Sequence, residues 1–434
     1  MSTVTIGLLG LVALILVFFT GIELALGMAI VGFIGFASVV GFKAASNLLV
    51  KDFFDTFSSY GFTVIPLFIL MGQIASTSNI AKRIYLAAHK FVGHVPGGLA
   101  MTTVLGATAF KAICGSSLAT VATFTGLAMP EMDRYGYNRK LATGVIASSG
   151  ALGLLIPPNV VLILYGLICE QSIGKLFLAG ILPALLAAFL FMVVIYGWVK
   201  IDPSIVPISG KASWTERRKA LPEFLAVAVI FFIIMGGLMF GLFSPTEAGT
   251  MGTVAVLVLA ALRKEVNLKM LINSIDHSIQ NACMILILVW GSVVLGHFLA
   301  VTKIPFMVAD WVVGLPLHRS LIIVLIIFVY LIGGSFIDDI AFMILATPIF
   351  YPPVMRLGYD PLWFAVIIGL TLMIGVIIPP VALNVFVIKN LTGIPFGVIY
   401  RGVVPFLAGL VVAIVLVFLF PGIATWLPYA LMGK

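Results

Sequence analysis

Long apolar runs dominate the chain, and their lengths predict membrane-spanning helices. A helix needs about 20 apolar residues to cross the hydrocarbon core of a bilayer. The clear candidates for single spans are residues 4–19, 24–40, 63–74, 176–198, 224–242, 251–262, 282–300 and 403–420. The run after Met1 lacks a basic segment and a small-residue cleavage site, so we expect a first span there, not a removed signal peptide. The pattern predicts an all-α polytopic protein in a lipid bilayer.

Four further apolar stretches do not fit one straight helix. Residues 97–129 and 321–354 are too long for one span, and glycine and polar residues interrupt each midway. Residues 141–169 and 362–389 each carry a double proline, which removes a backbone donor and breaks a helix. Broken backbone within a membrane is tolerated only where protein or a water-filled cavity supplies partners. We therefore expect residues 97–129 and 321–354 to form re-entrant hairpins and residues 141–169 and 362–389 to form broken helices. The functional site is expected in these four stretches.

Composition and charge narrow the class of protein. Of 434 residues, 62% are hydrophobic and 9% are charged, whereas a soluble chain is about a quarter charged. The net charge of +8 is spread over short loops, without the basic stripe that nucleic-acid binding needs. The five histidines and three cysteines show no metal-ligand spacing. Since the spans hold no nucleophile–base pair or metal motif, an intramembrane enzyme is disfavoured.

The basic residues predict which loops face the cytoplasm. Most of them fall in residues 82–90, 134–140, 200–223 and 263–269, and the positive-inside rule places such segments on the cytoplasmic side. The turn at 244–246 then lies outside. This assignment requires residues 97–129 to enter and leave on one side, as a re-entrant hairpin does. We expect a multi-pass protein of a bacterial inner membrane.

An internal repeat is the strongest signal in the chain. The hexapeptide Gly153–Pro158 recurs as Gly375–Pro380, a shift of 375 − 153 = 222, and Arg134–Tyr137 matches Arg356–Tyr359 at the same shift. Each repeat consists of a hairpin, a basic turn, a broken helix and a further helix. The two broken helices run in opposite directions under our topology, so the repeats are inverted. Inverted repeats with broken helices are typical of secondary transporters.

The repeats divide the chain into scaffold and transport elements. Residues 80–92 and 304–317 look amphipathic and could be arms along the membrane plane or plain interfacial loops. The expected units are 1–94 (scaffold spans and first arm), 95–175 (repeat 1 transport elements), 176–302 (central scaffold spans with loop 200–223), 303–320 (second arm), 321–392 (repeat 2 transport elements) and 393–434 (C-terminal span).

The hairpin tips and double prolines are the candidate Na⁺ sites. Na⁺ is a hard cation that prefers several oxygens, many of which can be backbone carbonyls. A proline break frees carbonyls, and glycine lets a second backbone approach closely. The candidate ligands are Gly115, Ser116, Ser117, Gly153, Ile156 and Pro157 in repeat 1, and Gly334, Asp338, Gly375, Ile378 and Pro379 in repeat 2. These residues could instead only shape a turn and a kink, but their repetition favours function.

Several polar residues inside apolar stretches are further candidates. Asp338 and Asp339 are adjacent carboxylates at membrane depth, where a charge suggests function; alternatively, one reaches water while the other caps a half-helix. Lys111 is expected to extend its ammonium to the cytoplasmic interface. Asn159, Asn384 and Ser335 are candidate substrate contacts, although interhelical hydrogen bonding explains the asparagines equally well.

The motifs of both halves resemble a known transporter family. Gly115–Thr120 followed by Ile156–Pro158 is similar to the first half of the large membrane subunit of TRAP (tripartite ATP-independent periplasmic) transporters. Gly334–Asp339, Pro348–Phe350 and Ile378–Val381 resemble the second half. The resemblance implies an elevator-type, Na⁺-coupled importer of a small organic anion. It also implies two partners, a small four-helix membrane subunit and a periplasmic substrate-binding protein. A stand-alone carboxylate or arsenite-type carrier of similar build is the alternative.

Overall fold

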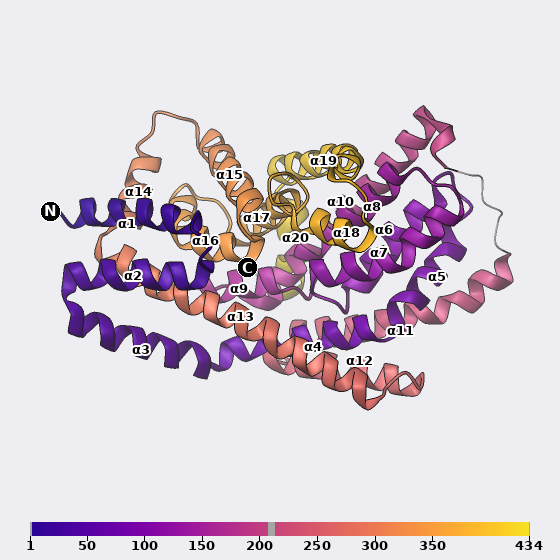
Figure 1. Ribbon diagram of the computed structural model, residues 1–434, viewed down its shortest axis with the longest axis horizontal. Helices are drawn as coiled ribbons and strands as arrows, with labels where there is room; N and C mark the ends of the chain where they lie inside the picture. The colour runs from indigo at the N-terminus through magenta and orange to yellow at the C-terminus, as the bar shows by residue number, and fades with distance from the viewer. Residues whose placement is uncertain (1, 207–212, 434) are drawn as a thin grey trace.

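The computed structural model describes residues 2–206 and 213–433, which fold mainly into helices (Figure 1). Among these residues, seven helical segments have the length and apolar character to cross a membrane, and three shorter helices are also apolar. The prediction of an all-α polytopic protein is confirmed. The expected cytoplasmic loop 200–223 is described only in part, because residues 207–212, with Lys211, lie outside the described residues.

One group of helices, the scaffold, lies outside the two repeats. The 34-residue α13 lies against α2 and α4, and α12 packs on α4. In Figure 1, α1 to α3 form the end of the molecule that holds the N-terminus, and α13 runs from there toward α4 and α12. The scaffold comprises α1 (Thr3–Phe18), α2 (Leu24–Val40), α3 (Phe42–Ser58), η1 (Tyr60–Thr63), α4 (Val64–Thr77), α11 (Trp214–Met239), α12 (Pro245–Leu262) and α13 (Leu268–Val301).

Helix α3 has no counterpart among the predicted spans. Lys51, Asp52 and Asp55 interrupt its apolar positions, so it lacks the continuous apolar run that marks a spanning helix. Its aromatic side chains instead form one apolar stripe, where Phe53 stacks on Phe57 and meets Trp290 of α13 edge to face. The helix is therefore amphipathic and packs through one side.

The six α-helices of one repeat correspond one to one with those of the other, and the short η2 of repeat 1 has no counterpart. The first helices after the tips start at Ser117 and Asp339, and the broken helices start at Arg139 and Pro361, so both pairs differ by 222. Repeat 1 comprises α5 (Ile80–Val92), α6 (Gly98–Lys111), α7 (Ser117–Arg134), α8 (Arg139–Ala151), η2 (Leu152–Leu154), α9 (Val160–Ile168) and α10 (Ile173–Ile201). Repeat 2 comprises α14 (Ile304–Val313), α15 (Arg319–Phe336), α16 (Asp339–Arg356), α17 (Pro361–Gly375), α18 (Leu383–Thr392) and α19 (Phe396–Leu419). The short η3 (Pro203–Ile205) follows α10, and α20 (Gly422–Met432), which was not predicted, follows α19.

Both double prolines lie in a break between two helices, as predicted. In repeat 1, helix α9 restarts after Asn159, whose side chain accepts a hydrogen bond from the Leu162 amide and caps the new helix. In repeat 2, α18 restarts after Ala382, which has a left-handed backbone with φ of 48°. Each break leaves carbonyl groups without the intrahelical amide partners that a continuous helix supplies.

The repeats interlock, because each broken helix contacts both hairpins. Its first half packs on the hairpin of its own repeat: α8 on α6 and α7, and α17 on α15. Its second half crosses to the other hairpin, so that α9 packs on α16 and α18 on α7. Helices α8 and α19 touch through their backbones, since a Cβ on Gly144 would lie 2.1 Å from the Gly402 carbonyl oxygen. We call the helices α6 to α10 and α15 to α20 together the repeat body. It includes α10, which the expected units placed mostly in the scaffold, because α10 packs on α19, α20 and α6.

Two helices connect the repeat body to the scaffold. Helix α5, with the bounds expected for the first arm, lies against α6 on one side and α11 on the other. Helix α14 packs on α16 and touches α13 and α1. Both expected arms are therefore helices, and α14 ends at Val313, four residues before the predicted end at Leu317.

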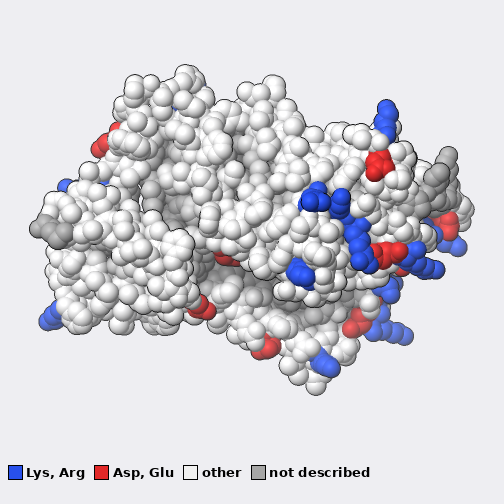
Figure 2. Space-filling model, turned by 45° about the horizontal axis from the view of Figure 1, so that its top comes forward, with Lys and Arg blue, Asp and Glu red and all other residues white. Residues whose placement is uncertain are grey.

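The basic segments that were predicted to share one side do gather at one end. Lys and Arg side chains crowd there, together with acidic ones (Figure 2). Arg83 of α5 pairs with Glu265 at 3.0 Å, and Arg263 pairs with Glu223 of α11 at 2.6 Å. The Asn138 amide donates to the Ile205 carbonyl at 3.0 Å. This hydrogen bond holds the turn between α7 and α8 against the segment after α10, at the same end of the molecule. Glu265 is nearly buried, and Arg263 and Glu223 are partly buried, so these ion pairs link α5, α11 and the segment after α12.

Candidate functional site

The tip of the first hairpin, residues 112–116, lies directly on the first double-proline loop. A Cβ on Gly115 would lie 2.7 Å from the Pro158 carbonyl oxygen, closer than side-chain carbons approach an oxygen, so this contact requires glycine. Scaffold helix α4 lies on the other side, where a Cβ on Gly72 would lie 3.5 Å from the Cys114 Cα. We call the contact between tip and loop the repeat 1 junction.

The two serines of the tip have different environments. Ser116 is exposed, and its hydroxyl caps α7 by accepting a hydrogen bond from the Ala119 amide at 3.3 Å. Ser117 is buried and donates to the Gly150 carbonyl at 2.9 Å and to Asn384 Oδ1 at 3.2 Å. Ser117 thus ties the first hairpin to both broken helices.

Lys111 lies inside the repeat 1 junction. Its side chain is fully buried, and its Nζ donates to the Ser116 carbonyl oxygen at 2.6 Å. A Cβ on Gly153 would lie 1.8 Å from Nζ, so the ammonium occupies the space that this glycine leaves. The prediction that Lys111 extends to the cytoplasmic interface is wrong. Lys111 is the last residue of α6, at the tip of the hairpin, which packs among the broken helices.

The second hairpin meets its double-proline loop in a similar way. A Cβ on Gly375 would lie 2.8 Å from the Gly334 carbonyl oxygen, and the Val381 amide donates to the Ser335 carbonyl at 3.1 Å. Pro379 is exposed and Ile378 partly exposed, whereas Ile156 and Pro157 of repeat 1 are buried. This repeat 2 junction is therefore the more open of the two.

Two carboxylates lie at the repeat 2 junction. Asp338 caps α16 by accepting a hydrogen bond from the Ala341 amide at 3.1 Å, and Asp339 is buried with 7% of its surface exposed. Within the described ranges, neither carboxylate forms an ion pair with a Lys, Arg or His side chain. A buried carboxylate is costly unless a positive charge or hydrogen bonds compensate it.

The three candidate substrate contacts are buried and bonded to protein. Asn384 accepts from Ser117 and donates to the Ala147 carbonyl at 3.0 Å, so it joins repeat 2 to repeat 1. Asn159 caps α9 and donates to the Ile156 carbonyl at 3.3 Å. The Ser335 hydroxyl donates one turn back, to the Ile332 carbonyl at 2.8 Å. The link between Asn384 and Ser117 joins residues 267 positions apart, and no local sequence pattern points to it.

The ends of helices give both junctions a preference for cations. Helices α6 and α8 end at the repeat 1 junction, and α15 and α17 end at the repeat 2 junction. Helix carboxyl ends carry partial negative charge and unpaired carbonyls. At repeat 2, carbonyl oxygens of the Gly334–Ser335 segment and of the loop, together with the Asp338 carboxylate, supply the hard oxygens that Na⁺ prefers. The residues present therefore fit a monovalent cation.

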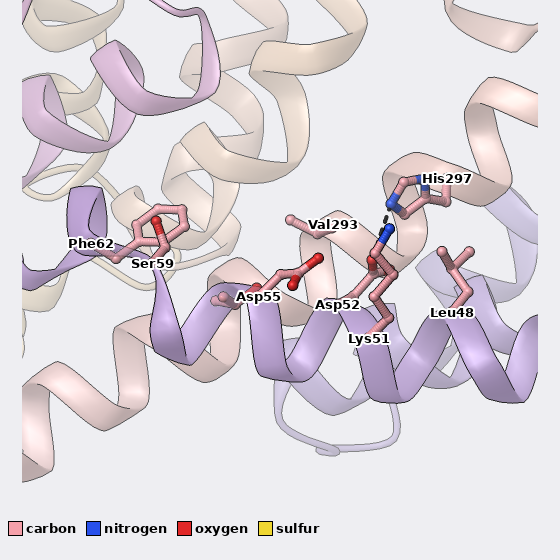
Figure 3. A pocket seen from close by; sticks show the side chains of 9 residues that line it. Leu48, Lys51, Asp52, Asp55, Ser59, Phe62, Val293 and His297 are labelled. Carbon is pink, nitrogen blue, oxygen red and sulfur yellow. Dashed lines mark ion pairs between the residues drawn. The ribbon is translucent and has the colours of Figure 1, made fainter.

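A separate pocket of about 320 Å³ lies in the scaffold, between α3 and α13 (Figure 3). Lys51, Asp52 and Asp55 of α3 line it together with His297 of α13. Asp52 pairs with His297 at 3.3 Å, the contact dashed in Figure 3. None of the lining residues belongs to either repeat, so this pocket is not part of the junctions.

Repeated hairpins and broken helices are typical of polytopic transporters, and comparison with known proteins gives the family of this chain. Residues 9–423 match the family described as "Tripartite ATP-independent periplasmic transporter, DctM component". The chain belongs to this family of TRAP transporter large permeases: it is a multi-pass protein of the bacterial inner membrane, and a transporter, not an enzyme.

Individual relatives agree over most of their length. The chain is 36% identical to the C4-dicarboxylate TRAP transporter large permease protein DctM of Pseudomonas aeruginosa, over 88% of this chain and 89% of that protein. It is 30% identical to the sialic acid TRAP transporter large permease protein SiaM of Vibrio cholerae, over 89% of this chain and 90% of that protein. Among solved structures, the YdaH transporter of Alcanivorax borkumensis has a similar fold, with a TM-score of 0.65, 14% identity and coverage of 89% and 90%.

Proposed function

We propose that this chain carries out Na⁺-coupled uptake of a small organic anion, a carboxylate or sugar acid. It would work with a separate small four-helix membrane subunit and a periplasmic substrate-binding protein. Family membership and the relatives named for C4-dicarboxylate and sialic acid support the substrate class and the partners. A stand-alone carrier of similar build remains the alternative.

One observation carries the proposal of ion coupling: among the described residues, no basic side chain forms an ion pair with the two acids of the repeat 2 junction. Asp338 and the buried Asp339 lie where the carboxyl ends of α15 and α17 meet, and within the described ranges no basic side chain pairs with either. A cation from solution would compensate this negative charge. Gly334, Asp338, Gly375, Ile378 and Pro379 would hold the Na⁺ of repeat 2, with Gly115, Ser116, Ser117, Gly153, Ile156 and Pro157 as the corresponding cation site of repeat 1.

The helices that begin at the junctions suit an anion. Helices α7, α9, α16 and α18 all begin at the tips or loops, and helix N-termini favour negative charge. Asn159, Asn384 and Ser335 stay candidate substrate contacts. Each already makes a hydrogen bond to protein, so contact with a substrate requires that this bond be exchanged. Binding of the anion would thus be coupled to a rearrangement of the junctions.

The motion proposed is that of an elevator. The interlocked repeat body would move as a unit relative to the scaffold, with α5 and α14 as the arms that connect the two. The backbone contact of Gly144 with Gly402 supports assigning α19 to the moving unit. The repeats would have inverted topology, with the end at which Arg83 pairs with Glu223 and Glu265 in the cytoplasm.

The test is reconstitution of the chain in proteoliposomes with both candidate partners. Uptake of a radiolabelled C4-dicarboxylate and of sialic acid is measured with an inward Na⁺ gradient and with choline in place of Na⁺. We expect uptake of one substrate only with Na⁺ and only with both partners. Full-rate uptake by the chain alone would favour the stand-alone carrier, and equal uptake in choline would refute Na⁺ coupling.

A further inference from the structure

The two junctions differ in charge at positions that correspond between the repeats. At the shift of 222, Lys111 corresponds to Gly333, Ser116 to Asp338 and Ser117 to Asp339. Repeat 1 thus has a positive side chain and two neutral hydroxyls. Repeat 2 has no side chain at the position of the lysine and carries two acids instead. The difference is what results when one junction contains its own cation and the other takes one from solution.

The position of the Lys111 ammonium matches that expected of a cation. It lies where α6 and α8 end, so two helix carboxyl ends face it, and it donates to the Ser116 carbonyl at 2.6 Å. The Lys111 ammonium also contacts Gly153 at the break of the first broken helix. The counterpart of Gly153 in repeat 2 is Gly375, which meets the Gly334 carbonyl. A Cβ at position 153 would overlap the Lys111 ammonium, so the ammonium fits there only because residue 153 is glycine.

Burial of the ammonium also argues against a purely structural role. An ammonium has three N–H donors and is strongly hydrated, so full burial is costly unless acceptors or negative charge surround it. The Ser116 carbonyl takes one donor. A neutral apolar residue would fill the same space without this cost.

We propose that Lys111 is a tethered cation: its ammonium occupies the position of the coupling ion at the repeat 1 junction, and only repeat 2 takes Na⁺ from solution. The inference rests on the proposed function, because it assigns one of the two cation sites to the chain itself. It implies one Na⁺ fewer per transport cycle than two open sites would use. Removing the side chain should open a new Na⁺ site at repeat 1.

The test compares Lys111→Ala with Lys111→Met in the complex with the small subunit. Alanine removes the charge and leaves space for an ion, whereas methionine removes the charge but keeps a long side chain in that space. Lys43→Ala, on the exposed face of α3, is the control. Binding of radioactive sodium to the purified complexes is measured at constant ionic strength. Thermal unfolding against Na⁺ concentration gives a second count, because stabilisation rises with the logarithm of ligand concentration in proportion to the ions bound.

We expect Lys111→Ala to bind one Na⁺ more per chain than the wild type, and Lys111→Met and Lys43→Ala to bind the wild-type number. If Lys111→Ala and the wild type bind the same nonzero number, the inference is wrong while Na⁺ coupling stands. If the wild type binds none and Lys111→Ala binds one, Na⁺ coupling of the wild type fails, and with it the claim that repeat 2 takes Na⁺ from solution, while the tethered cation at repeat 1 stands. If no variant binds Na⁺, both fail. If Lys111→Ala does not assemble at any Na⁺ concentration while Lys111→Met does, the stem and not the charge is required, which also overturns the inference.

Discussion

Gly375→Ala tests whether the close contact at the repeat 2 junction is needed for Na⁺. The new Cβ would lie 2.8 Å from the Gly334 carbonyl oxygen, whereas ordinary contact begins at 3.4 Å. The hairpin tip and the loop must therefore separate by about 3.4 − 2.8 = 0.6 Å. Both sides of the contact are backbone, so no side-chain rotation can relieve it. Overpacking of this kind costs about 1–3 kcal/mol.

We expect most of that cost to appear in Na⁺ affinity, because the carbonyls of tip and loop both belong to the proposed site. A loss of about 1–3 kcal/mol corresponds to roughly a 5- to 150-fold higher half-saturating Na⁺ concentration. The assay is uptake of substrate against Na⁺ concentration in proteoliposomes, at matched protein content. The control is Gly236→Ala in α11, where a Cβ meets no atom within 4 Å. A Gly375→Ala complex with a wild-type Na⁺ curve would refute a Na⁺ site at this contact.

Three further predictions follow from the hydrogen bonds and charges of the junctions. Asp338→Asn should raise the half-saturating Na⁺ concentration, because it removes a charge at the repeat 2 junction, whereas Ser116→Ala, which removes a helix cap worth about 1 kcal/mol at the junction that Lys111 fills, should leave the Na⁺ curve near that of the wild type; a wild-type curve for Asp338→Asn would contradict this. Asn384→Ala should lower the thermal unfolding temperature of the complex, since the Ala147 carbonyl loses its donor and a buried unpaired group costs about 1–3 kcal/mol, and an unchanged temperature would show that the link between the repeats is not stabilising. Single cysteines at Ser213 and Ser244 should react with an impermeant reagent from outside only at Ser244, and the reverse pattern would overturn the topology.

Much of the fold could be predicted because its signals are local. A double proline breaks a helix wherever it lies, and the two motifs located the broken helices. Apolar stretches too long for one span located the hairpins, and an amphipathic pattern located the arm at Ile80–Val92. Helix α3 was missed because its pattern is amphipathic, whereas a predicted span requires a continuous apolar run. The crossing of α9 and α18 to the other hairpin has no local signal at all.

The junctions were predictable in part. Glycines at the tips indicated close backbone contact, and the structure shows Gly115 on Pro158 and Gly375 on Gly334. The position of Lys111 could not be predicted, because an apolar helix with one lysine gives no indication of the direction in which its end faces. The sequence rule that a lysine in a membrane extends to the interface fails when the helix ends inside the protein. Likewise, the partners of Asn384 depend on packing between distant segments.

The most direct test of the central claim is Na⁺-driven accumulation by the reconstituted complex of the chain, the small subunit and the substrate-binding protein. The internal and external Na⁺ concentrations are varied while a potassium diffusion potential holds the membrane voltage constant. We predict that the anion accumulates against its own gradient only when Na⁺ is higher outside, and that accumulation stops when the Na⁺ gradient is abolished. Accumulation that is unchanged when Na⁺ is equal on both sides, or replaced by choline, would contradict the account.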